Sequence, residues 1–313
     1  APSNKKITLD LNGHKLTGAN KANCTLEDFA KSTSTKLTLE VNVSTAELTV
    51  TDSSAAKTGT IDGAVGVKNG KFTLTAGKIT GGVYMTGDSA VLNIKGGEVS
   101  DKWATLNYNA GTVNITGGTI FGGTGTSNVI CMQNSDKAKL NISGSATIEG
   151  GNFVDVKTPF SKGNIQITGG YYKDDAVKNY LTDDYALVSS TSRTGYYQVL
   201  MCERAMIGTA AYPSLKKALE AAAIGDTIKI LEDMELNVTV SKEVTIDLNK
   251  HVITAKGSRP AITVAKGGKL TLTSSSSESR DGQSDFCGAI KKGKGKYAVV
   301  NEGGKLNIEK GNY

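Results

Sequence analysis

The chain has 313 residues, of which 37 are glycine, 4 are proline and 6% are aromatic. Short strands joined by tight turns suit this mixture, which argues against a helical bundle. The 36 basic and 30 acidic residues leave a net charge of +6, and charge alone indicates no polyanion partner. No apolar run is long enough to cross a bilayer. The four cysteines contain no CxxC pair, so zinc-ligand spacing is absent and no cofactor or metal is expected.

The first predicted strand lies in the phrase Ile7-Thr-Leu-Asp-Leu-Asn-Gly-His14, which follows almost directly after Ala1. We interpret His14 as a turn residue that is bonded to its neighbours. The alternative is a catalytic base paired with Asp10. No capping helix precedes this strand, and the chain stops within a run of strands. We therefore expect either a fragment of a longer array or a subunit that stacks end to end with copies of itself.

Further along the chain, one phrase recurs: an apolar-polar-apolar strand, a polar residue, glycine and a second short strand. Steps of 20, 21, 27 and 25 residues separate its marker positions, too short for a βαβ unit and suited to one coil of a solenoid. The sequence therefore predicts an all-β, right-handed parallel β-helix with like apolar residues stacked in successive coils. The marker positions are Leu74, Ile94, Ile115, Ile142 and Ile167.

The same alternation places a row of polar residues on the outer face of the stack. These side chains carry hydroxyl and amide groups that suit glycan binding, and nearby aromatic rings would serve as platforms. The aromatic candidates in this stretch are Trp103 and Tyr108, together with Tyr84. The alternative is that the row is only the solvated side of a sheet. The polar positions are Thr73, Asn93, Asn114, Asn141 and Gln166.

Two short helices are predicted near the middle of the chain. Residues 174–181 open with acidic side chains and would close the top of a first module, residues 1–201. Residues 215–223 follow Ser214 as N-cap and would begin a second, incomplete module, residues 207–313. We interpret an acidic cluster as helix capping and a solvated turn, with cation binding as the alternative. Its members are Asp174, Asp175, Asp183 and Asp184.

The second module repeats the opening phrase as Val244-Thr-Ile-Asp-Leu-Asn-Lys-His251, 237 residues after its first appearance. The duplication of His14 as His251 favours a structural role for both. A basic run, Lys291 to Lys296, is interpreted as a solvated loop, with contact to an anionic wall polymer or polysaccharide as the alternative.

At these phrases the chain resembles the pectin-lyase-like parallel β-helix superfamily, in particular repeat segments of surface proteins from Gram-positive bacteria. The segments that carry the resemblance are YPSLKKALEAAAIGDTIKILEDMEL from Tyr212, VTIDLNKHVIT from Val244 and ITGGYYKDDAVKNYLTDDYALV from Ile167. The resemblance implies capping helices, a solenoid fold and an extracellular or cell-surface location. The scaffold serves enzymes, adhesins and stalks alike, so it implies no single activity.

The preferred hypothesis is a non-catalytic scaffold used in adhesion, in displaying other domains or in assembling a fibre. The first alternative is a polysaccharide lyase or glycoside hydrolase of the same fold. The calcium-holding carboxylates and basic strand residue of that enzyme class have no match here. The second alternative is a carbohydrate-binding module. The partners considered are a glycan or cell-wall polymer and a second copy of the chain, with no nucleic acid and no membrane insertion.

Overall fold

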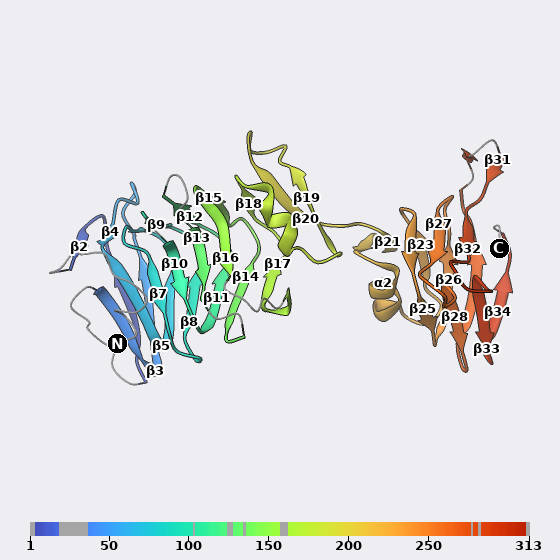
Figure 1. Cartoon of the computed structure of the whole chain (residues 1–313), viewed down its shortest axis with the longest axis horizontal. Coiled ribbons are helices and arrows are strands. Elements are labelled where there is room, and N and C mark those ends of the chain that lie inside the picture. Colours follow the sequence, from blue (N-terminus) through green and yellow to red (C-terminus); the bar gives the residue numbers. More distant parts are fainter. Residues whose placement is uncertain are drawn as a thin grey trace. The chain divides into compact units, whose positions relative to one another are not determined.

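The computed structural model describes residues 4–18, 37–102, 104–123, 128–133, 136–156, 162–276, 278–280 and 283–310. The chain forms two compact units, residues 1–200 and 201–313 (Figure 1). Both are mostly β, as the composition predicts. The first unit ends at Leu200 and the second begins at Met201. The modules expected from the sequence, residues 1–201 and 207–313, place the boundary between residues 201 and 207.

The first unit contains an 11-stranded sheet in which paired strands run parallel. The long strand β5 pairs with β7 along its first half and with β8 along its second half, so the sheet holds two rows of stacked strands. A 3₁₀ helix, η2 (Lys162–Asn164), precedes the last strand. The strands are β1 (Lys6–Asp10), β3 (Leu37–Thr51), β5 (Ala64–Leu74), β7 (Val83–Met85), β8 (Val91–Ile94), β10 (Ala104–Tyr108), β11 (Gly111–Ile115), β13 (Asn128–Met132), β14 (Ala138–Ile142), β16 (Asn152–Val156) and β17 (Ile165–Ile167).

A second sheet of the same unit contains nine strands. Its strands pair in parallel as far as β18, where β20 joins with antiparallel pairing. The strands, in spatial order, are β2 (Lys15–Thr17), β4 (Thr60–Asp62), β6 (Lys78–Ile79), β9 (Glu98–Asp101), β12 (Thr119–Gly122), β15 (Thr147–Glu149), β18 (Tyr171–Tyr172), β20 (Tyr197–Met201) and β19 (Tyr185–Ser189).

Within the range 174–181 the structure has a 3₁₀ helix, η3 (Asp175–Tyr180), rather than an α-helix. Asp174 is its N-cap, and the Asp174 Oδ1 accepts a hydrogen bond from Ala176 N at 2.9 Å. Strands β19 and β20 then extend the second sheet, a feature that the sequence pattern does not predict. The end of this unit is therefore formed by added strands as well as by a helix.

The marker residues of the repeat are paired with one another in neighbouring strands. Leu74 pairs with Ile94, Ile94 with Ile115, and the row continues through Ile142 to Ile167. All five side chains are buried, and they belong to the apolar core of the unit. Each such burial contributes about 1.5 to 3 kcal/mol. The predicted stacking of like residues is confirmed at these positions.

Glycine follows the marker strands because consecutive layers approach closely at the turn. Gly97 and Gly118 both have φ of +76°. A Cβ atom on Gly97 would lie 2.4 Å from the carbonyl oxygen of Gly77, and one on Gly118 would lie 2.7 Å from that of Gly97. Only a residue without a side chain satisfies both the backbone conformation and the spacing.

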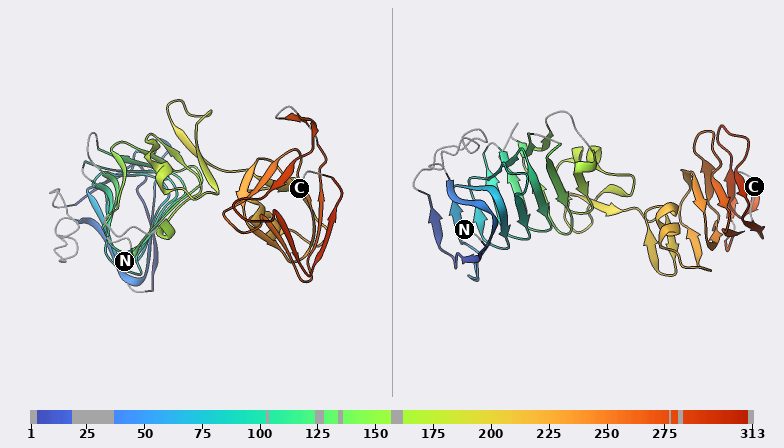
Figure 2. Two further views of the ribbon diagram at one scale, coloured as in Figure 1. Left: turned by 45° about the vertical axis from the view of Figure 1, so that its right-hand side comes forward. Right: turned by 90° about the horizontal axis from the view of Figure 1, so that it is seen from below.

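In the second unit, strands that are three apart in the sequence pair with each other from β23 to β29, so the chain visits three sheets in turn. The strands enclose an apolar interior (Figure 2). A separate pair, β30 (Glu278–Arg280) and β31 (Gln283–Phe286), lies outside these sheets. The three sheets contain β22 (Ala210–Tyr212), β21 (Ala205–Ile207), β23 (Thr227–Ile230), β26 (Glu243–Asp247), β29 (Lys269–Thr273) and β34 (Lys305–Ile308); β24 (Met234–Leu236), β27 (Val252–Ala255) and β32 (Ala289–Lys291); and β25 (Val238–Val240), β28 (Ile262–Ala265) and β33 (Val299–Glu302).

The α-helix of this unit, α2 (Leu215–Ala221), lies within the predicted range 215–223. Ser214 is its N-cap, and the Ser214 Oγ accepts a hydrogen bond from Lys217 N at 3.3 Å. Leu215, Ala218 and Leu219 are buried against the core of the second unit. The helix therefore covers apolar residues with one face, as its spacing of apolar positions predicts.

Candidate functional site

The predicted polar row is a hydrogen-bonded ladder. Asn93 Nδ2 donates to Thr73 Oγ1 at 3.3 Å. Asn114 Nδ2 donates to Asn93 Oδ1 at 2.9 Å, and Asn141 Nδ2 donates to Asn114 Oδ1 at 2.8 Å. Thr73 is buried, and the three asparagines are half-buried. Because their amides hydrogen-bond to one another, the ladder connects successive strands, and these bonded groups are not available to a ligand.

The two described tyrosines expected as aromatic platforms beside this ladder are buried. Tyr108 is 1% exposed, and its hydroxyl donates to the carbonyl oxygen of Lys139, so the prediction that it binds a ligand is wrong. Tyr84 is 4% exposed and is excluded in the same way. Trp103 lies outside the described residues. The alternation of Leu106 with Tyr108 in β10 was the signal that both side chains face inward.

Asp10 and His14 belong to a turn that occurs twice. Asp10 Oδ1 accepts hydrogen bonds from Asn12 N at 3.0 Å and from Ser53 N at 2.9 Å. In the duplicated phrase, Asp247 Oδ1 accepts from Asn249 N at 3.0 Å and from Ser275 N at 2.7 Å. The repetition of this geometry supports a structural role for both carboxylates.

The electrostatics of this turn point the same way. The hydrogen bonds from Ser53 and Asn12 lower the pKa of Asp10, whereas a general base works best with a raised pKa. The backbone N–H of His14 donates to the carbonyl oxygen of Leu11 at 2.7 Å, and the backbone N–H of His251 donates to the carbonyl oxygen of Leu248 at 2.8 Å. Both histidines therefore occupy the same backbone turn.

Asp52 is a buried carboxylate beside the first of these turns. Its Oδ1 accepts from Gly13 N at 2.8 Å, and its Oδ2 accepts from Gly59 N at 2.6 Å. Burial raises the pKa of Asp52, but hydrogen bonds from Ser54, Gly59 and Gly13 outweigh burial and lower that pKa to about 2. Asp52 therefore clamps two neighbouring layers as a carboxylate.

Two members of the acidic cluster at the end of the first unit bond to neighbouring residues. Asp174 caps η3, and Asp175 forms an ion pair with Lys178 at 2.6 Å. Within the described ranges, no group of three or more His, Cys, Asp or Glu side chains gathers closely enough to hold a metal ion.

A cluster of aromatic and charged side chains, which sequence reasoning missed, lies on the outer face of the nine-stranded sheet. The Arg193 guanidinium lies 4.0 Å from the Tyr171 ring centroid, and the Lys173 ammonium lies 3.9 Å from the Tyr196 ring centroid. Arg193 Nη1 also donates to Thr147 Oγ1 at 2.6 Å. We name this group the Tyr171 cluster: Thr147, Glu149, Tyr171, Lys173, Arg193 and Tyr196.

Electrostatic contacts link the members of the Tyr171 cluster. The Tyr196 hydroxyl donates to Glu149 Oε2, and this bond raises the pKa of the phenol. Tyr171 and Tyr196 are half-buried, and Lys173 and Arg193 are exposed. Rings, a carboxylate and two cations together suit recognition of a polar, ring-shaped ligand. No local motif reveals the cluster, because its members come from three segments of the chain, and Thr147 and Glu149 lie 46 and 47 residues from the partners that they contact.

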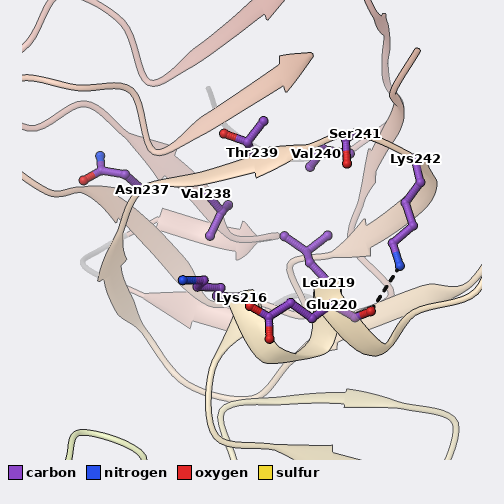
Figure 3. Close-up of a pocket in the computed structure, with 9 residues that line it drawn as sticks. All are labelled: Lys216, Leu219, Glu220, Asn237, Val238, Thr239, Val240, Ser241 and Lys242. Carbon is purple, nitrogen blue, oxygen red and sulfur yellow. Dashed lines mark hydrogen bonds between the residues drawn. The ribbon is translucent and has the colours of Figure 1, made fainter. Parts of the chain in front are cut away.

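A groove of about 550 Å³ lies between α2 and the edge strand β25 of the second unit (Figure 3). Leu219, Val238 and Val240 contribute its apolar part, and polar side chains line the rest. Lys242 Nζ donates to the carbonyl oxygens of Glu220 and Ala222, so this lysine ties β25 to the end of the helix.

The described strands of both units pair mainly in parallel, and hydrogen bonds from asparagine amides and to aspartate carboxylates join neighbouring segments. Comparison with protein-family models, with curated proteins and with solved structures gives no match. None of the described helices is long and apolar enough to span a membrane.

Proposed function

We propose that both units are right-handed parallel β-helices. The second unit supports this because its chain returns to the same sheet at every third strand, with parallel pairing each time. Connections between parallel strands of one sheet are right-handed in about 98% of cases. The register of the marker residues in the first unit supports the same winding.

We also propose that the protein is a non-catalytic scaffold at the cell surface or outside the cell, used in adhesion, domain display or fibre assembly. One observation carries this proposal: the polar groups that could serve in catalysis are instead hydrogen-bonded between neighbouring segments of the sheets. The asparagine ladder and the carboxylates of Asp10, Asp52 and Asp247 all join one layer to another. Polar groups that are used in this way hold the strands together, which suits a scaffold.

The proposal is tested by incubating the full chain with acidic and neutral polysaccharides and measuring new reducing and unsaturated ends. The expected result is no release above background. Release that is lost in Asp10→Ala or His14→Ala would establish the lyase or hydrolase alternative and overturn the scaffold role. Antibody labelling of intact cells tests the location, with labelling expected before permeabilisation.

The Tyr171 cluster favours a second function, carbohydrate binding. A glycan array compares the native chain with Tyr196→Phe and Arg193→Lys. Tyr196→Phe loses the hydrogen bond to Glu149, and Arg193→Lys keeps the charge but loses the planar group beside Tyr171. Binding that falls about ten-fold or more in Arg193→Lys supports the function, and binding that is equal in all three proteins contradicts it.

A further inference from the structure

Two loops of the second unit are stacked directly on each other. Residues 256–261 join β27 to β28, and residues 292–298 join β32 to β33. The pairs Thr254 with Lys291 and Ile262 with Val299 flank these loops. Seven residues lie between the flanking positions in each segment, so the two segments are in register with each other.

Lysine and glycine alternate from Lys292 to Lys296 in the later loop, here called the upper loop, and this pattern follows from the stacking. The Lys294 N–H donates to Gly257 O at 2.8 Å. A Cβ atom on Gly293 would lie 2.2 Å from Ala255 O, and one on Gly295 would lie 2.2 Å from Ser258 O. Glycine is required where the loops touch, and lysine fills the positions between. The basic run is thus held against the layer below instead of forming a loose loop.

The lower loop is itself held in place. The Asn237 amide donates to Pro260 O at 2.8 Å and to Arg259 O at 3.3 Å. These bonds fix the backbone on which the lower cations lie. Both loops therefore present their charges from a defined surface.

Six cations gather on this surface, and all six are exposed. The ion pairs found in the described part of the second unit involve other residues, such as Arg204 with Glu232 and Lys269 with Glu243. Adjacent layers are about 4.8 Å apart, well inside a Debye length of about 8 Å, so the charges repel one another. An anionic ligand relieves this repulsion. We name this group the basic face: Lys256, Arg259, Lys291, Lys292, Lys294 and Lys296.

Tyr297 follows the last lysine and is 64% exposed. An amphipathic ring that stays in water beside a row of cations suits the apolar face of a sugar. Duplex recognition needs an element that enters a groove, and single strands need successive aromatic platforms. The basic face has neither, and this favours a glycan over a nucleic acid.

We infer that the basic face binds a linear anionic polysaccharide, with the cations contacting its repeating carboxylates or sulfates and Tyr297 stacking on a sugar ring. The inference deepens the adhesive role proposed above and rests on it for its setting. Its test is separate, because it measures binding, whereas the tests of the scaffold role measure polysaccharide cleavage and cell-surface labelling.

The test uses the full chain and a triple variant, Lys256→Gln, Lys294→Gln and Lys296→Gln. The matched control removes three exposed lysines of the first unit, Lys6→Gln, Lys95→Gln and Lys139→Gln. Calorimetry at low and physiological salt measures binding to polygalacturonate, dextran sulfate and neutral dextran. Polygalacturonate and dextran sulfate distinguish carboxylate from sulfate recognition. Circular dichroism melting confirms that all proteins are folded.

At low salt, the basic-face variant is expected to bind anionic polysaccharide about ten-fold or more weakly, with a shallower salt dependence, while the control stays close to native. Tyr297→Ala is expected to weaken binding about three-fold without changing the salt dependence. Equal affinity of the two triple variants overturns the inference. Duplex DNA is titrated in the same way, and tighter binding to it than to either anionic polysaccharide overturns the glycan assignment.

Discussion

Asn114 occupies the middle of the amide ladder, where it both donates to Asn93 and accepts from Asn141. Asn114→Ala removes both bonds and is expected to lower the free energy of unfolding by about 1 to 3 kcal/mol. Asn307→Ala is the control, because Asn307 is exposed and its amide donates to Glu309 in its own strand region. That control is expected to change stability by less than about 0.5 kcal/mol. Urea denaturation measures both, and equal losses would mean that the ladder does not stabilise the stack.

Asp52 makes the stability of the fold depend on pH. Its folded pKa of about 2 lies below the ordinary value of 3.8, so its carboxylate stabilises the fold above pH 3.8. That contribution is lost as the pH falls from 3.8 towards 2. Asp52→Asn is therefore expected to be less stable than native at neutral pH, with the difference shrinking across this window.

Urea midpoints between neutral pH and pH 2 test this dependence. Asp88→Asn is the control for removing a carboxylate, because Asp88 is exposed and pairs with Lys137 on the surface. A native-to-variant difference for Asp52→Asn that stays constant from pH 5 to pH 2 would show that the clamp contributes nothing as an anion.

At the scale of the element, glycine is used in turns for two reasons, positive φ and close approach of the neighbouring backbone. Variants of Gly118 and of Gly225, which lies in the turn between α2 and β23, separate the two. Gly118 has a positive φ and touches the layer below, whereas Gly225 has φ of +88° and open space where a Cβ would lie, with no atom within 4 Å. Gly225→Ala is expected to cost about 1 to 2 kcal/mol from conformation alone. Gly118→Ala is expected to cost more, because the layers must also separate. Equal costs, measured by urea denaturation, would show that close approach is unimportant.

The whole molecule shows which features a sequence reveals. Ile94 and Ile115 could be placed on one face because alternation and a step of 21 residues determine both their direction and their layer. Arg193 could not be placed beside Tyr171, because the last strands of the unit bring it there by antiparallel pairing after a helix. Likewise, the sequence of residues 291–296 indicates only a solvated loop, because the second loop beneath it is distant in the chain. Contacts within the repeat are predictable, and contacts that join separate segments are not.

Each unit has its own apolar core, so the whole chain is expected to unfold in two separable transitions. Ile115→Ala in the first core and Ile246→Ala in the second each remove a fully buried side chain and should cost about 2 to 5 kcal/mol. Each variant should shift one transition and leave the other unchanged. Calorimetry of the full chain measures both. If either variant moved both transitions together, the two cores would form one cooperative unit.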